Sequence, residues 1–250
     1  MKVELTAPKN FSEMTEKQLR YLCALLVAGQ TESQIHVKCF VRFTGIKIVA
    51  HKEHIYFFKK SKTPGFFQLT DEQVAGFASK FKFLTSRYEG IKPFERIGPD
   101  AKPYERLLRD TNFATYFEAE NSYQAYIFKK DENYLVRLLA VLYQTTTEYV
   151  LKHATDQDRI MCLMWFMGIK EYFAKKWKYL FKKDDLDDGN DDEPVPPNMF
   201  EIITNQVRIL TQGDITKNKL VLGSPTWDAL TELDNKCREY EQLKTKTQNV

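Results

Sequence analysis

Apolar side chains recur at intervals of three and four residues along most of this 250-residue chain, the spacing of amphipathic helices. Such a stripe covers residues 15 to 28 and ends before Gly29. The pattern Thr31-Glu-Ser-Gln34 is a capping box, which predicts a second helix through about Phe43. Thr70-Asp-Glu-Gln73 repeats the pattern ahead of a further helix. The N-terminal part therefore begins as a helical hairpin.

The same spacing continues through the rest of the chain. It predicts helices with apolar stripes over residues 113–127 and 135–142, a buried helix over residues 156–181, a helix from Asn198 to Gly213, and a last helix opened by Ser224 as cap and Pro225 as first helical residue. Residues 85–110 hold several Gly and Pro residues and are expected to form an irregular connection.

Two short aromatic runs break the helical pattern. Ile55-Tyr-Phe-Phe58 and Phe66-Phe-Gln-Leu69 flank a segment that ends in Pro-Gly, which predicts a β-hairpin near residues 54–69. The predicted fold class is mainly α, a multi-helix bundle-like domain with a small β element near residues 46–69 that contains this hairpin. The predicted parts are a helical hairpin plus β-hairpin region over 1–110, a buried helical core over 111–183, an acidic Pro-rich linker over 184–197, and C-terminal helices over 198–250, all of which could form one domain.

Composition narrows the class of protein. A hydrophobic content of 43% and a charged content of 28% are typical of a soluble globular chain, and a net charge of +3 is too mild to imply nucleic acid. The four cysteines are far apart and form no C-x-x-C pair, which favours reduced cytosolic thiols. No signal peptide is apparent, and the longest apolar run, nine residues from Met161, is too short for a bilayer. We expect a cytoplasmic protein without a membrane partner.

The most acidic stretch, residues 184–193, contains seven acids and resembles a calcium loop at first sight. With Gly189 at loop position 6, however, Leu186 stands at position 3 and Val195 at position 12, where oxygen ligands are required. Prolines follow immediately, so the run is expected to be a solvated linker.

No motif in the chain indicates an enzyme. His51 and His54 are three residues apart beside a predicted strand, where their side chains would point to opposite faces and could not share a metal. Walker, dinucleotide and nucleophile-elbow patterns are missing from the sequence. We therefore expect no catalytic residues, no metal and no cofactor, although a constellation that forms only in the fold is not visible at this level.

Residues 16–43 have the outline of a helix-turn-helix, with Ser33, Gln34, Lys38 and Arg42 placed to face a DNA groove. Against this reading, the turn carries Gln30 where an apolar side chain is usual. Lys38 also falls where the second helix normally packs inward. DNA binding is the runner-up hypothesis.

The last helix carries one apolar stripe that includes Trp227, Leu230, Leu233 and Tyr240. The stripe either docks on its own domain or is offered to a partner helix or a second copy of the chain. These four residues are the candidate partner-binding residues.

Several segments resemble proteins of the tail-gene region of phages and prophages, some of which are assigned as tail assembly chaperones. The segments are Met14-Thr-Glu-Lys-Gln-Leu19, Phe117-Glu-Ala-Glu-Asn-Ser-Tyr-Gln-Ala-Tyr126, Leu135-Val-Arg-Leu-Leu-Ala-Val-Leu-Tyr143, Gly213-Asp-Ile-Thr-Lys217 and Trp227-Asp-Ala-Leu-Thr-Glu-Leu233. The resemblance implies a non-enzymatic protein of the host cytoplasm that binds a helical tail component during assembly. Such chaperones are often shorter than this chain, so a structural tail or connector component is the third hypothesis.

Overall fold

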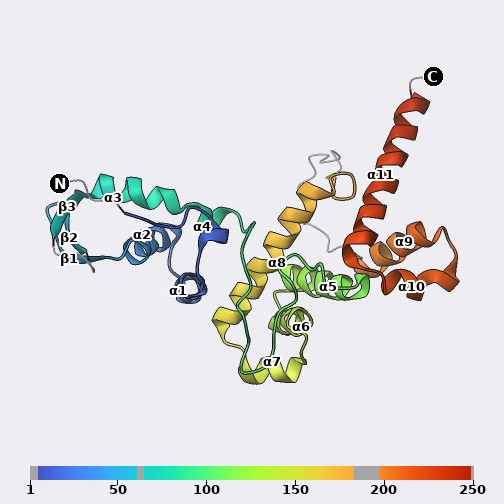
Figure 1. Cartoon of the computed structure of the whole chain (residues 1–250), viewed down its shortest axis with the longest axis horizontal. Helices are drawn as coiled ribbons and strands as arrows, with labels where there is room; N and C mark the ends of the chain where they lie inside the picture. The colour runs from blue at the N-terminus through green and yellow to red at the C-terminus, as the bar shows by residue number, and fades with distance from the viewer. Residues whose placement is uncertain (1–4, 61–64, 183–197, 249–250) are drawn as a thin grey trace. The chain divides into compact units, whose positions relative to one another are not determined.

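The computed structural model describes residues 5–60, 65–182 and 198–248. Within them the chain forms eleven α-helices and one three-stranded antiparallel sheet, which confirms the mainly α class (Figure 1). The acidic segment 184–193 and the linker to residue 197 lie outside the described residues. The bundle-like arrangement and the predicted part boundaries stay predictions.

The described residues divide into two compact units that interleave in sequence, and each is described by itself. Unit 1 comprises Met1–Phe94 and Thr155–Gly168, and unit 2 comprises Glu95–Ala154 and Ile169–Val250. Unit 1 holds α1 (Glu16–Val27), α2 (Glu32–Phe43), β1 (Ile46–Lys52), β2 (Ile55–Lys60), β3 (Phe66–Thr70), α3 (Asp71–Ala78), α4 (Phe83–Ser86) and the first part of α8 (Asp156–Lys176). Unit 2 holds α5 (Phe113–Lys129), α6 (Glu132–Leu142), α7 (Thr147–His153), the end of α8, α9 (Met199–Thr211), α10 (Asn218–Leu222) and α11 (Thr226–Gln248).

Local capping chemistry sets the helix starts in unit 1. The side chains of Thr15, Thr31 and Thr70 each accept a hydrogen bond from the backbone N–H three residues on, and the Gln at that position reaches back to the cap. The capping boxes predicted at Thr31 and Thr70 are confirmed. Each box satisfies backbone donors that a helix start otherwise leaves unpaired.

The core of unit 1 is aromatic. Phe40 of α2 stacks on Phe77 of α3 with ring centroids 5.6 Å apart, and it meets the fully buried Phe58 of β2 edge-on at 6.5 Å. Such arrangements add to the stabilisation from burial alone. The sheet is thereby fixed through one face to α2 and α3.

The sheet has three strands in the order β1-β2-β3, so the predicted hairpin of residues 54–69 is only its second half. That hairpin does not include β1, which pairs antiparallel with β2 and contains an irregularity between Ile48 and Ala50. That bulge places Val49 outside the ladder and interrupts the alternation by which strands are recognised.

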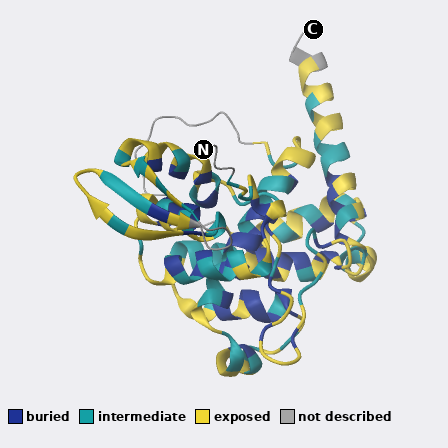
Figure 2. Cartoon of the chain, turned by 60° about the vertical axis from the view of Figure 1, so that its left-hand side comes forward, coloured by how far each residue is buried: buried dark blue, intermediate teal, exposed yellow. Residues whose placement is uncertain are grey.

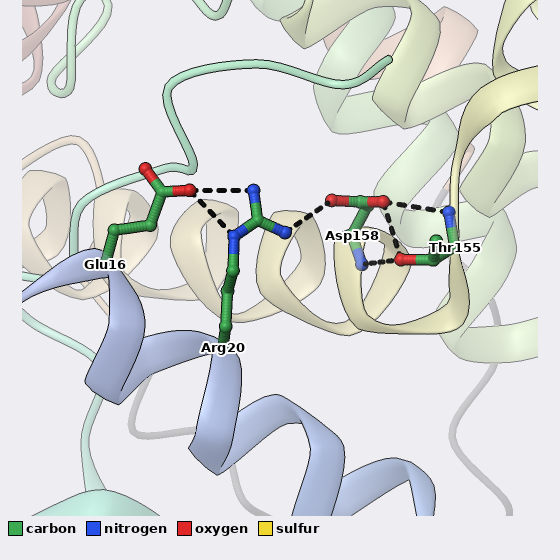
Figure 3. Close-up of polar contacts among 4 residues, drawn as sticks. All are labelled: Glu16, Arg20, Thr155 and Asp158. Atoms are coloured by element: carbon green, nitrogen blue, oxygen red, sulfur yellow. Dashed lines mark hydrogen bonds and ion pairs between the residues drawn. The ribbon is translucent and has the colours of Figure 1, made fainter.

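A polar network within unit 1 joins α1 to the start of α8 (Figure 3). Asp158 is buried and accepts hydrogen bonds from the backbone N–H and the hydroxyl of Thr155, at 2.8 and 2.6 Å. Arg20 forms an ion pair with Glu16, with Nη2 2.7 Å from Oε1, and a second ion pair with Asp158, with Nη1 3.6 Å from Oδ1. The guanidinium also lies 3.9 Å from the ring centre of Phe94. This network gives a buried carboxylate its partners, as burial of a charge requires.

Unit 2 buries the inner faces of α5 and α6, which pack against each other, together with the end of α8 (Figure 2). The predicted helix over 156–181 ends earlier, at Lys176, and a turn follows it. The expected cap at Ser224 is wrong by one residue. Its hydroxyl donates instead to the Val221 carbonyl at 2.6 Å, and the Pro225 carbonyl accepts the first helical bond of α11.

Candidate interaction surface

Large apolar side chains are strongly exposed mainly in the C-terminal part of unit 2. Among the described residues, six of them are more than 60% exposed, and five of these lie between residues 199 and 243. The five are Phe200, Ile215, Leu220, Tyr240 and Leu243, at 80%, 80%, 74%, 69% and 63%. Exposed apolar side chains indicate a contact surface where they share a patch or a groove, and of these five Tyr240 lines a groove.

The first half of α11 is firmly attached to the rest of unit 2. The Trp227 indole meets Trp177 edge-on with ring centroids 5.3 Å apart, and its N–H donates to the Leu107 carbonyl at 2.8 Å. The guanidinium of Arg109 lies 4.5 Å from the centre of the Trp227 ring. This half of the helix is therefore part of the core, and Trp227 serves as its anchor.

Asp234 fixes the turn that follows α8. Its carboxylate accepts the backbone N–H groups of Tyr179 and Leu180 at 2.8 and 3.0 Å. A carboxylate that accepts two backbone donors makes strong, charge-assisted bonds. The turn is thus held against the middle of α11.

The second half of α11 leaves this packing. Figure 1 shows that it extends beyond the helices of unit 2 that contact the first half, and Figure 2 shows the same protrusion with mostly exposed residues. Of the candidate partner-binding residues, Leu230 and Leu233 are 1% and 0% exposed and cannot meet a partner while the helix stays docked. Trp227 is half-buried, and Tyr240 alone is open to solvent.

A groove of about 890 Å³ runs along this second half of α11. Its apolar lining comes from the turn after α8, from α9 and from α11 itself: Tyr179, Leu180, Ile209, Cys237 and Tyr240. Lys182, Lys236 and Lys244 also line it, and Glu241 is the single acid of the lining, held by Lys182 at 2.8 Å. We name this feature the α9–α11 groove. Its chemistry is apolar along the floor and basic overall.

Sequence reasoning did not identify Tyr179 and Ile209 as parts of a site. Both lie far from α11 in sequence, and only the folded chain brings them to Tyr240. Tyr240 itself follows from the apolar stripe of the last helix, which was the one local signal available.

A smaller cavity of about 230 Å³ in unit 2 contains a buried carboxylate. Glu120 Oε1 accepts from Gln124 Nε2 at 2.6 Å and from Lys170 Nζ, whereas Glu120 Oε2 has no hydrogen-bond partner among the described residues. The Glu120–Lys170 pair is neutral as a whole. The cavity can therefore accept a neutral donor, such as a hydroxyl or an amide N–H, on an otherwise apolar body.

The candidate DNA-binding residues of α2 are all exposed, but three of them already have contacts within unit 1. Gln34 belongs to the capping box, Lys38 donates to the Gln30 side chain, and the Arg42 guanidinium lies 5.6 Å from the ring centre of Tyr21. Ser33 lines a shallow hollow beside α3. A DNA-binding role of this helix stays a prediction.

The expectation that His51 and His54 point apart is wrong. His51 Nε2 and His54 Nδ1 each lie 2.9 Å from a different oxygen of Asp71, the first residue of α3. The reason is the two-residue turn at Glu53 and His54, whose positive φ angles of 47° and 67° take His54 out of the strand geometry. Hydrogen bonds from His54 and His51 lower the pKa of Asp71. Both ring nitrogens are engaged with the carboxylate, and the described residues contain no arrangement of three or more such side chains suited to a metal ion.

The three buried cysteines, Cys23, Cys39 and Cys162, lack the surroundings of a nucleophile. Burial raises the pKa of Cys23 and of Cys39 to about 12, and burial also raises the pKa of Cys162. A thiol with such a pKa stays protonated at neutral pH, whereas the thiolate is the reactive form.

Comparison with known proteins does not assign the chain. No family model matches it, and neither do curated proteins or solved structures. Among the helices described, none is both long enough and apolar enough to cross a membrane.

Proposed function

We propose that this chain is a non-enzymatic interaction protein that binds an amphipathic helical segment of a partner protein in the α9–α11 groove. The observation that carries the proposal is the groove itself, which combines an apolar floor with three lysines on a helix end that protrudes from its unit. An amphipathic helix binds such a groove by burying its apolar face, with anchors at intervals of three and four residues.

The charge of the groove selects among helices. Lys182 is paired with Glu241 at 2.8 Å and Lys236 with Glu232 at 3.3 Å. Lys244 adds a further positive charge to the lining, so a partner helix with acidic side chains beside its apolar face is favoured. Tyr240 supplies a rigid aromatic contact with a polar tip, a residue type that often dominates binding energy. The partner is therefore expected to be acidic and amphipathic.

The resemblance to tail-region proteins of phages supports a helical tail component as that partner, with the chain acting in virion tail assembly. A chaperone of this kind protects apolar helical surface before assembly, and an open apolar groove is suited to that task. A structural tail component would use the same surface permanently, so the lifetime of the complex distinguishes the two roles.

Site-specific cross-linking tests the proposal. A photoreactive phenylalanine at Tyr240 of the full chain, incubated with lysate from phage-producing cells, should capture a discrete protein through an acidic amphipathic segment. The matched control carries the same probe at Leu151, which is 60% exposed on α7 and lies outside the groove.

Other products would overturn the proposal. Cross-links between two copies of the chain would make the groove a homo-oligomer interface. Cross-links to residues 184–193 of the same chain would make the acidic segment its occupant. Equal capture from Tyr240 and Leu151 would mean that exposure alone explains the contacts.

A further inference from the structure

The second face of the sheet in unit 1 is exposed and has a composition unlike that of its buried face. Because partners across an antiparallel pair share a face, the register places Lys47, Lys59 and Phe66 in one row, and Ala50, Phe57 and Gln68 in the next. The opposite face contains Phe58, which is fully buried against α2. Lys47, Lys59, Phe66 and Gln68 are exposed.

The positive charges on this outer face of the sheet destabilise the fold. Lys47 and Lys59 lie directly opposite each other, and like charges at such positions repel. Lys52 adds a third positive charge, and no Asp or Glu occurs at the described strand positions of this face. Unit 1 as a whole carries sixteen Lys and Arg against ten Asp and Glu. A repulsive pair without an acidic neighbour on its face is suited to an anionic ligand.

Aromatic rings lie among these charges. Phe66 is 69% exposed although it is a large apolar residue, and Lys59 Nζ lies 5.9 Å from its ring centre. Phe57 is the diagonal cross-strand neighbour of Phe66 and is half-buried, and diagonal neighbours are about 7–8 Å apart. Two rings at this separation within a basic field form a platform for stacking successive planar groups.

We propose that the outer face of the β1-β2-β3 sheet binds single-stranded nucleic acid, a function separate from partner binding in unit 2. The lysines contact phosphates, while Phe57 and Phe66 stack on bases, which are open for stacking only in an unpaired strand. A sheet face without a protruding helix favours a single strand over the groove of a duplex. Contacts to phosphates and to the faces of bases carry no base identity, so binding should be independent of sequence.

The test uses the full chain and fluorescence anisotropy with a labelled thymidine oligonucleotide of about 20 nucleotides, titrated at several salt concentrations. Lys47→Gln with Lys59→Gln should weaken binding and reduce the slope of log affinity against log salt by about 1.4. Phe66→Ala should weaken binding about 5-fold or more and leave that slope unchanged, because it removes stacking and no charge.

The matched control is Lys152→Gln with Lys219→Gln, two exposed lysines of unit 2 that give the same change in net charge. The control should bind like the unmodified chain, and the sheet variant should unfold at no lower urea concentration, since its substitutions remove a repulsion. Absence of salt-dependent binding would overturn the proposal. Equal weakening by both double variants, or tighter binding of duplex that Phe66→Ala does not affect, would overturn it as well.

Discussion

Gly168 is predicted to be one of the least replaceable residues of unit 1. It lies inside α8, where alanine is normally the better helix former by about 1 kcal/mol. A Cβ at this position, however, would lie 2.2 Å from the Tyr88 carbonyl oxygen and 3.3 Å from Ile91 Cγ2. The contacting oxygen of Tyr88 belongs to the backbone, so no side-chain rotation can move it away from the added Cβ.

The size of the destabilisation follows from the backbone movement that an added Cβ at Gly168 requires. Separating a Cβ from that oxygen to more than 3.0 Å needs a backbone displacement of about 1 Å, and overpacking of this kind costs about 1–3 kcal/mol. The same carbonyl accepts the Ile91 N–H at 3.2 Å, a bond worth about 1 kcal/mol. We expect Gly168→Ala to lower the free energy of unfolding by about 1–3 kcal/mol, after allowance for the gain in helix propensity.

Urea denaturation followed by circular dichroism measures this change. The matched control is Gly76→Ala in α3, another helical glycine, whose added Cβ meets nothing within 4 Å. It should raise stability by about 0.5–1 kcal/mol. The two substitutions are chemically identical and should have opposite signs. A Gly168→Ala protein as stable as the unmodified chain would refute the packing of Tyr88 against α8.

Three further predictions concern other parts of the chain. Trp227→Ala should lower the free energy of unfolding by about 2–4 kcal/mol, measured by urea denaturation, because it removes ring contacts and the indole bond to the Leu107 carbonyl. A thiol reagent at about pH 8 should label the partly exposed Cys237 of the native chain but react with Cys23, Cys39 and Cys162 only after denaturation, since these three thiols are buried. Asp71→Asn should be less stable than the unmodified chain at neutral pH. Because the pKa of Asp71 is lowered from 3.8, that difference should disappear as the pH falls through the lower value of the folded state, in urea midpoints measured against pH.

Helix starts were predictable because their chemistry is local. The capping boxes at Thr31 and Thr70 use residues three positions apart, and the structure forms both. The positions of the His51 and His54 side chains could not be predicted from the sequence, because they depend on two non-glycine residues with positive φ in the turn between β1 and β2. Such residues rarely adopt this conformation, and only contacts with Asp71 from outside the hairpin reveal the arrangement.

The candidate interaction surface was also predictable only in part. The apolar stripe of the last helix was visible in the sequence, but one stripe contains both the fully buried Leu233 and the exposed Tyr240. Periodicity identifies the face of a helix, whereas the extent of its docking depends on where the neighbouring helices end. Ile209 joins the groove from a helix distant in sequence, which no local pattern could indicate.

Calorimetric titration of the captured partner segment, as a synthetic peptide, into the full chain measures directly whether the α9–α11 groove binds an acidic amphipathic helix. We expect saturable binding that weakens about 30-fold in a Tyr240→Ala, Ile209→Ala variant and remains unchanged in Leu151→Ala. Equal affinity of the peptide for the unmodified chain and for the Tyr240→Ala, Ile209→Ala variant would show that the groove is not its binding site.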